Sequence, residues 1–297
     1  MWRAGGYHLP RVEGASMNQG ALLAIFASLI FSVMNTLVKI IADDIPTGEI
    51  VFFRSSIGCL LVLLLMYRYG VVFSREDRPL LVLRGAMGGL YLICYFYSIA
   101  NLTLADASML VYLSPFFSIL LSLLVMRERI NANALFWLVM VIIGAILLVR
   151  PWDFSAYTLA SLVGVLSAVF AAIAYLSVNK LSKRHHNYEI VFYFLFIATL
   201  LSLPLMWNSF IWPNAYQFAI LLSIALVSLL GQVVLTQAFY SENLIVVSVV
   251  RYIGIVFNIG WGWLFWNEIP MQLSIFGSLL VVVSCIQLGL LNRNKAV

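Results

Sequence analysis

One arginine stands alone in a long apolar stretch near the end of the chain. Between Leu244 and Trp266 the sequence runs for 23 residues with Arg251 as its only full charge. A guanidinium stays protonated, and placing it at the centre of a membrane helix costs at least about 2.5 kcal/mol. Helical spacing puts Asn258 on the same face as Arg251, so this face could bind a carboxylate or a phosphate.

Arg251 also has a structural alternative. Seven residues separate it from Leu244, a distance of about 10 Å at 1.5 Å per residue. Its side chain points back toward that end of the helix, so the guanidinium could reach the membrane interface along its own aliphatic stem. A ligand contact and an interfacial position are therefore both open for this residue.

Tyrosine, amide and hydroxyl side chains recur at helical spacing on other apolar runs. The candidates for substrate contact are Tyr91 and Tyr95, Gln232 and Thr236, Asn35 and Tyr175, and Ser114. An aromatic wall that faces amide and hydroxyl groups would suit an amphipathic solute with an apolar body. These residues also have structural alternatives. The tyrosines could serve packing, Asn35 could make an interhelical hydrogen bond, and Ser114 could bond its own backbone beside Pro115.

Two further arginines are expected to have structural roles. Arg54 lies six residues into its predicted helix and leans toward the outer end, where Asp43, Asp44 and Glu49 are available. An ion pair there would remove the cost of an isolated charge. Arg84 lies near the predicted cytoplasmic end of the next helix, and we expect it to anchor that helix at the interface.

The elements that must position these residues are membrane helices. The chain is 63% hydrophobic and 10% charged, with a mean hydropathy of +1.02, and it contains repeated apolar runs of about 20 residues, the length that spans a bilayer. Ten spans follow: 21–41, 48–67, 81–100, 105–126, 133–149, 157–180, 188–206, 215–240, 244–266 and 272–291. The predicted fold class is therefore an all-α integral membrane protein.

Loop charges predict the orientation of these spans. Thirteen basic residues fall on one side, against Lys39 and Arg150 on the other. This bias places both termini in the cytoplasm of a multi-pass protein in the inner or plasma membrane. No nucleic acid partner is implied, because the basic residues lie in the loops and their distribution is explained by the orientation of the spans. We expect no metal and no cofactor: the histidines lack further ligands nearby, and no phosphate-binding Gly-Lys-Ser/Thr loop is present.

The two halves of the sequence repeat each other. Glu49–Phe52 recurs as Glu189–Phe192, an offset of 140 residues (189 minus 49), and the same offset pairs Glu128 with Glu268. Each of the latter glutamates ends one helix and precedes another, so we expect it to cap the helix that follows. Because each unit has five spans, the second unit enters the membrane from the opposite side, as in the inverted repeats of secondary transporters.

These features resemble the EamA family of the drug/metabolite transporter superfamily. The resemblance rests on the two units, on Phe53-Arg54, on Leu83-Arg84-Gly85 and on the paired glutamates. It implies a first repeat at 18–150 and a second at 151–292, flanked by cytoplasmic segments 1–17 and 293–297. It also implies a central cavity and alternating access by rocking of the two halves.

One position departs from the family pattern. The repeat places Ile255 opposite Pro115, so we expect the fourth helix of each unit to bend differently, since only the first has the missing donor and the kink of a proline. Pro115 is therefore assigned a structural role.

Together these features predict a secondary transporter rather than an enzyme. Its substrate would be a small carboxylate-bearing or zwitterionic metabolite, such as an amino acid or a derivative, exported by a monomer or a homodimer. The alternatives are an exporter of cationic or drug-like solutes, and a membrane assembly or receptor subunit that transports nothing. No acidic residue falls in mid-span, which disfavours proton antiport through a buried carboxylate.

Overall fold

The computed structural model describes residues 17–126, 132–149, 156–242 and 244–293, and every regular element within them is an α-helix. In chain order these are α1 (Met17–Ile41), α2 (Thr47–Tyr69), α3 (Arg78–Asn101), α4 (Leu104–Val111), α5 (Ser114–Met126), α6 (Ala132–Val149), α7 (Ala156–Leu181), α8 (Asn187–Met206), α9 (Ala215–Ser241), α10 (Leu244–Val250), α11 (Ile253–Trp266) and α12 (Gln272–Arg293). The predicted all-helical architecture is confirmed. The predicted cytoplasmic segment before Met17 and the last four residues lie outside the described part.

Seven helices in the described part are long and apolar enough to cross a membrane. They are Gln19–Ile41, Thr47–Tyr69, Arg78–Asn101, Tyr157–Leu181, Asn187–Met206, Ala215–Ser241 and Val246–Trp266. Shorter apolar helices cover Leu135–Val149 and Gln272–Leu288. Large apolar side chains such as Leu60 and Val256 are exposed on the bundle, as expected where lipid takes the place of water. The chain is thus a multi-pass membrane protein.

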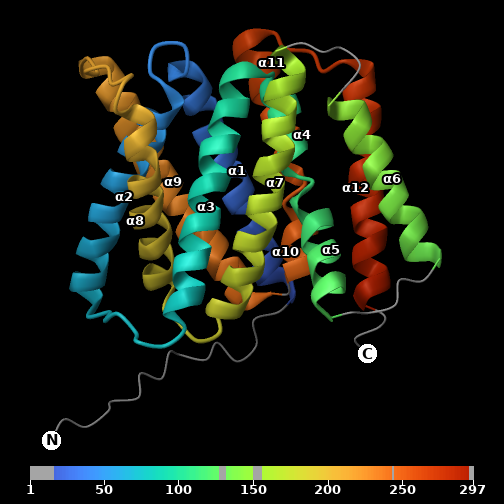
Figure 1. The fold of residues 1–297 in the computed structure, drawn as a ribbon, viewed down its shortest axis with the longest axis horizontal. Helices are drawn as coiled ribbons and strands as arrows, with labels where there is room; N and C mark the ends of the chain where they lie inside the picture. Colours follow the sequence, from blue (N-terminus) through green and yellow to red (C-terminus); the bar gives the residue numbers. More distant parts are fainter. Residues whose placement is uncertain (1–16, 127–131, 150–155, 243, 294–297) are drawn as a thin grey trace, which may run out of the picture.

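The helices pack in pairs that follow the sequence repeat. Helix α1 packs against α9, and its repeat counterpart α7 packs against α3, while α2 packs against α8 and α6 against α12. In Figure 1 the α1–α2 connection lies at the top of the bundle and the α7–α8 connection at the bottom. The two units therefore run in opposite directions about a central pseudo-two-fold axis.

Both units interrupt their fourth helix at nearly the same repeat position. Tyr112 and Leu113 separate α4 from α5, and Arg251 and Tyr252 separate α10 from α11, one residue earlier at the offset of 140. The rings of Tyr112 and Tyr252 lie 5.6 Å apart between centroids, so the two interruptions touch. A proline is not needed for the interruption: Pro115 is the second residue of α5, whereas α10 and α11 separate without one. The unequal bending of the two helices stays a prediction.

A glycine explains how the interruptions approach so closely. A Cβ at Gly254 would lie 2.1 Å from the hydroxyl oxygen of Tyr112, far inside contact distance. Around the break the backbone N–H of Gly254 donates to the backbone carbonyl of Arg251 at 2.9 Å, and that of Ile255 donates to the backbone carbonyl of Tyr252 at 3.0 Å. These tight-turn hydrogen bonds satisfy backbone groups that an interruption inside a membrane would otherwise leave exposed.

A pair of glycines joins α6 to α12. A Cβ at Gly144 would lie 2.8 Å from the carbonyl oxygen of Gly277, and one at Gly277 would lie 2.9 Å from that of Gly144. Close approach through small residues is a standard basis of helix association in membranes.

We expect Gly144→Ala to separate α6 from α12 and to lower the unfolding temperature in detergent, because overpacking costs about 1–3 kcal/mol. Gly260→Ala is the matched control, since a Cβ at Gly260 meets nothing within 4 Å. Equal melting temperatures for the two variants would contradict the close crossing.

Candidate functional site

Three predicted polar residues form one hydrogen-bonded cluster near the helix interruptions. The side-chain amide of Asn35 donates to the hydroxyl of Tyr95 at 2.8 Å and to the amide oxygen of Asn258 at 3.2 Å. Asn258 in turn donates to the carbonyl of Gly254 at 2.9 Å. The cluster ties α1 and α3 to the first turns of α11, so it couples both units at the break.

The guanidinium of Arg251 lies inside the bundle. Its Nη2 donates to the hydroxyl of Tyr175 at 3.1 Å, and its carbon centre lies 4.7 Å from the Tyr175 ring centroid and 5.9 Å from that of Tyr112. Its Nε is buried without a hydrogen-bond partner. Of the two sequence interpretations, this geometry favours the position inside the bundle over the membrane interface.

A small cavity adjoins this arginine. Its lining comes from six helices of both units and comprises Phe31, Met34, Arg54, Arg84, Tyr91, Leu92, Ala174, Tyr175, Phe194 and Gln232. Three of the predicted contacts, Tyr91, Tyr175 and Gln232, are therefore brought together. Tyr91 stacks on Tyr95 with ring centroids 5.8 Å apart, which connects the cavity to the asparagine cluster. Aromatic, amide and guanidinium groups are thus available to a solute at this point.

Two of the predicted contacts, Thr236 and Ser114, belong neither to the cavity lining nor to the asparagine cluster, and they do not contact Arg251. The Thr236 hydroxyl donates to the carbonyl of Gln232 in its own helix at 2.8 Å. Ser114 begins α5, and its carbonyl accepts the hydroxyl of Ser118 at 2.9 Å. Both residues are buried. The backbone bond at Ser114 is donated by the hydroxyl of Ser118, so the role of the Ser114 hydroxyl stays a prediction.

The predicted role of Arg54 was wrong. Instead of an ion pair with the acids at the outer end, its guanidinium lies 5.3 Å from the Phe194 ring centroid and lines the cavity. Arg84 is likewise no interfacial anchor, because it is 2% exposed and lies 4.5 Å from the same ring. The sequence did contain a signal for Arg84: it shares a helix face with Gly88, Tyr91 and Tyr95.

Glu268 caps a helix, but not the expected one. Its Oε2 accepts the backbone N–H of Leu104 at 2.9 Å, at the start of α4 in the other unit. Its Oε1 forms an ion pair with Lys39, which also donates to the carbonyl of Leu102 at 2.9 Å. The prediction that Glu268 caps the helix after it was therefore wrong, because the repeat brings the other unit closer. Glu128, its repeat counterpart, lies outside the described residues.

We expect Glu268→Gln to destabilise the protein, because it leaves the ammonium of Lys39 without its counter-charge. Both side chains are mostly buried, at 13% and 16% exposure, and breaking a buried pair costs about 3–5 kcal/mol. Thermal unfolding of Glu268→Gln, Lys39→Met and the double variant measures the coupling. Additive effects would contradict a direct interaction, and Asp44→Asn, an exposed carboxylate, is the control.

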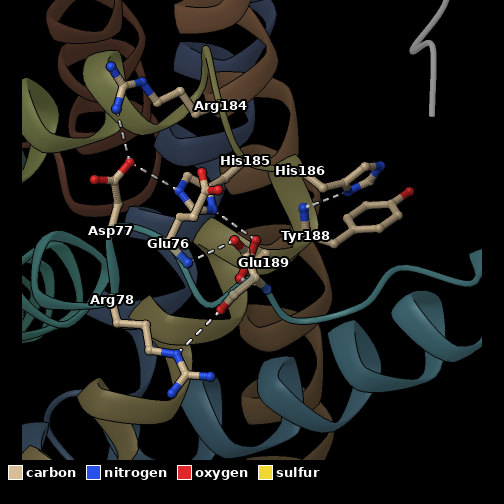
Figure 2. Close-up of polar contacts among 9 residues, drawn as sticks. Glu76, Asp77, Arg78, Arg184, His185, His186, Tyr188 and Glu189 are labelled. Carbon is tan, nitrogen blue, oxygen red and sulfur yellow. Dashed lines mark hydrogen bonds and ion pairs between the residues drawn. The ribbon is translucent and has the colours of Figure 1, made fainter. Parts of the chain in front are cut away.

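A polar network links the α2–α3 and α7–α8 connections at the opposite end of the bundle (Figure 2). The ring of His185 lies between the carboxylates of Glu189 and Asp77, at 3.0 and 3.6 Å, and Asp77 also contacts Arg184 at 3.4 Å. Glu189 additionally accepts the backbone N–H of Ser74 at 2.7 Å. Because His185 and Glu189 are buried, the network is a fixed connection between the two units.

The neighbouring histidine differs in environment. His186 caps the first turn of α8, where its Nδ1 accepts the amide of Tyr188 at 3.2 Å (Figure 2). Burial lowers the pKa of His186 below its ordinary value, and the carboxylate of Glu189 opposes this shift. Within the residues that the structure describes, no group of three or more acidic, histidine or cysteine side chains is placed to hold a metal ion.

Comparison with known proteins identifies the family of this chain. The family model described as "EamA-like transporter family" matches twice, at residues 18–150 and 158–290. The chain belongs to the EamA-like transporter family. This membership confirms the resemblance inferred from the sequence, and it places the protein among transporters rather than enzymes.

Individual EamA relatives extend the comparison. The chain is 55% identical over 275 residues to the pseudopaline exporter CntI of Pseudomonas aeruginosa, covering 92% of this chain and 96% of the relative. It is 26% identical over 282 residues to human solute carrier family 35 member G1, covering 89% and 77%. A solved crystal structure shares the fold with a TM-score of 0.67 at 18% identity, covering 94% of this chain and 99% of that one.

Proposed function

We propose that this EamA protein is a secondary transporter that exports a small metabolite bearing a carboxylate, in free or zwitterionic form. The observation that carries the proposal is the partly buried guanidinium of Arg251, which is held against Tyr175 beside the cavity and whose buried Nε has no partner. Charge-assisted hydrogen bonds from a guanidinium suit the planar oxygens of a carboxylate. Export is supported by the name of the 55% identical relative.

The proposal extends to the membrane topology. Ten spans would be formed by two inverted units at 18–150 and 151–292, with α4 and α5 forming one interrupted span and α10 and α11 another. Exposed basic residues support the orientation: Arg68, Arg75 and Arg78 flank the α2–α3 connection, and Lys183 and Arg184 lie in the α7–α8 connection. Figure 1 places both connections at one end of the bundle. This end would face the cytoplasm, and both termini would lie on the same side of the membrane.

Alternating access gives the interruptions a role. Discontinuous helices at the midplane bind substrate in other inverted-repeat transporters, and here both interruptions meet at Tyr112 and Tyr252 beside the cavity. The asparagine cluster and the Arg251–Tyr175 bond would form and break as the units rock. Asn35, Tyr91, Tyr95, Gln232 and Asn258 would then orient the rest of the solute.

An efflux profile tests the proposal. Proteoliposomes are loaded with a cytosolic small-molecule extract, and mass spectrometry identifies the solutes that leave faster than from liposomes without protein. We expect acidic and zwitterionic metabolites to be depleted. Selective loss of cationic or drug-like solutes would contradict the proposal in favour of the other transport class, and no selective loss would favour a subunit that transports nothing.

A further inference from the structure

Two buried arginines share one aromatic ring at the wall of the cavity. The guanidinium carbons of Arg54 and Arg84 lie 5.3 and 4.5 Å from the ring centroid of Phe194, and each residue is 2% exposed. The cation–π contact offsets part of the cost of burying the two charges. Two like charges on one ring still repel each other in a medium of low polarity.

Three of the six guanidinium nitrogens of these two arginines have no hydrogen-bond partner in the protein. Nε and Nη1 of Arg54 and Nε of Arg84 are buried without a hydrogen-bond partner. Among the residues that the structure describes, the ion pairs involve Lys39, Arg184 and His185, and neither Arg54 nor Arg84 takes part. A buried guanidinium donor without an acceptor is costly, so these groups point to an anion from outside the chain.

Neither charge is repeated in the second unit. An offset of 140 residues pairs Arg54 with Phe194 and Arg84 with Ile224, so the second unit uses apolar side chains at both equivalent positions. Arg54 and Phe194 are repeat counterparts that contact each other, which places their contact on the pseudo-two-fold axis. The charge of Arg251 is likewise not repeated, because the counterpart of Arg251 in the first unit is Val111.

Space for the Arg84 guanidinium is provided by a glycine. A Cβ at Gly88 would lie 2.1 Å from Nη1 of Arg84 and 2.6 Å from the Phe194 ring. The side chain therefore runs along its own helix toward Tyr91, and both residues line the cavity together with Tyr175. Tyr175 also bonds Arg251, so the two cationic positions share a neighbour. The cavity has a volume of about 10 Å³, enough for one water molecule, so a solute that contacts both positions requires the two units to move apart.

We propose that Arg54 and Arg84 form a second anion subsite in this cavity, so that the solute carries at least two carboxylates. One carboxylate binds Arg54 and Arg84 over Phe194, and the other binds Arg251 beside Tyr175. The inference rests on the proposed function for the identity of the site, but it concerns binding and is tested without transport. A phosphate group could satisfy the same donors, so the experiment includes it.

Thermal unfolding of the purified full chain in detergent, at constant ionic strength, measures binding. The ligands are the dicarboxylates malonate, succinate, glutarate and adipate, the monocarboxylate butyrate, and inorganic phosphate. We expect at least one dicarboxylate to stabilise the protein at a concentration about tenfold or more below that of butyrate, since a second charged contact is worth at least a factor of ten.

Variants assign the preference to the second subsite. Arg84→Lys keeps the charge but loses the planar fork, and we expect it to reduce the dicarboxylate response to the level of butyrate. Gly88→Ala should do the same by displacing Arg84. Arg68→Gln, which removes an exposed charge at the end of the same helix as Arg54, should leave the preference unchanged.

Each contrary result would overturn a different part of the account. Equal responses to dicarboxylates and butyrate, or a preference that survives Arg84→Lys and Gly88→Ala, would overturn the second subsite even if export is observed. A phosphate response that exceeds every dicarboxylate and requires Arg84 would overturn the assignment to carboxylates. A dicarboxylate preference in a protein that shows no efflux would uphold the subsite and refute the proposed function.

Discussion

Replacing Arg251 by glutamine should reduce the efflux rate of the acidic substrate about 10-fold to 100-fold, with the fold intact. The variant removes the positive charge but keeps an amide that can still bond the hydroxyl of Tyr175. A charge-assisted hydrogen bond contributes about 1.5–3 kcal/mol, and each 1.4 kcal/mol is a factor of ten. Initial efflux from proteoliposomes measures the effect, and unfolding temperatures establish that the variant folds.

Arg68→Gln provides the control for this change. Arg68 is exposed at the end of α2, and its replacement by glutamine changes the net charge by the same amount as Arg251→Gln. It should transport like the wild type. If both variants carried the acidic substrate at the wild-type rate, the argument for an anion from Arg251 would be lost. If both were slowed equally, the effect would be one of net charge rather than of the site.

Gly254→Val should abolish transport by separating the two helix interruptions. Even a Cβ at this position would lie 2.1 Å from the Tyr112 hydroxyl and 3.5 Å from the Cβ of Ser28. The clash is with the far end of the Tyr112 side chain, which is itself buried, so the ring of Tyr112 has to shift against its neighbours at the interruption of the other unit. We expect a loss of about 1–3 kcal/mol in stability, and a loss of efflux greater than this destabilisation explains.

The control is Gly260→Val on the same helix. It makes the same substitution at a position where a Cβ meets nothing within 4 Å. Comparing unfolding temperature and efflux for the two variants separates the close approach from the general effect of valine in a helix. Wild-type efflux by Gly254→Val would show that contact between the interruptions is not required for transport.

The fold was largely predictable because the repeat and the membrane both leave strong sequence signals. Long apolar runs report spans directly, and one offset aligns Glu49 with Glu189. In the structure these two glutamates accept equivalent backbone bonds, from Ile211 at 3.0 Å and from Ser74 at 2.7 Å. The interruption in the second unit was not predictable from Pro115, because α10 and α11 separate without a proline, at a point where the two units contact each other through Tyr112 and Gly254.

The site was only partly predictable, for a related reason. Helical spacing identified Tyr91, Tyr175 and Gln232, because residues on one face of a helix stay together in any packing. The same reasoning gave the wrong partner for Arg54. The acids nearest to it in sequence lie at the end of its helix, whereas its guanidinium contacts Phe194 in the other unit. Likewise, Glu268 bonds Leu104 across the two units. Sequence distance is a poor guide wherever two repeats interlock.

Counterflow tests the central claim, secondary transport of an anionic metabolite, most directly. Proteoliposomes are preloaded with the acidic metabolite that leaves fastest in the efflux profile, and uptake of a trace of its labelled form is followed with no ion gradient. The account predicts a transient accumulation of label in wild-type vesicles and in Arg68→Gln, and little or none in Arg251→Gln. No accumulation above protein-free vesicles, or equal accumulation in wild type and Arg251→Gln, would contradict it.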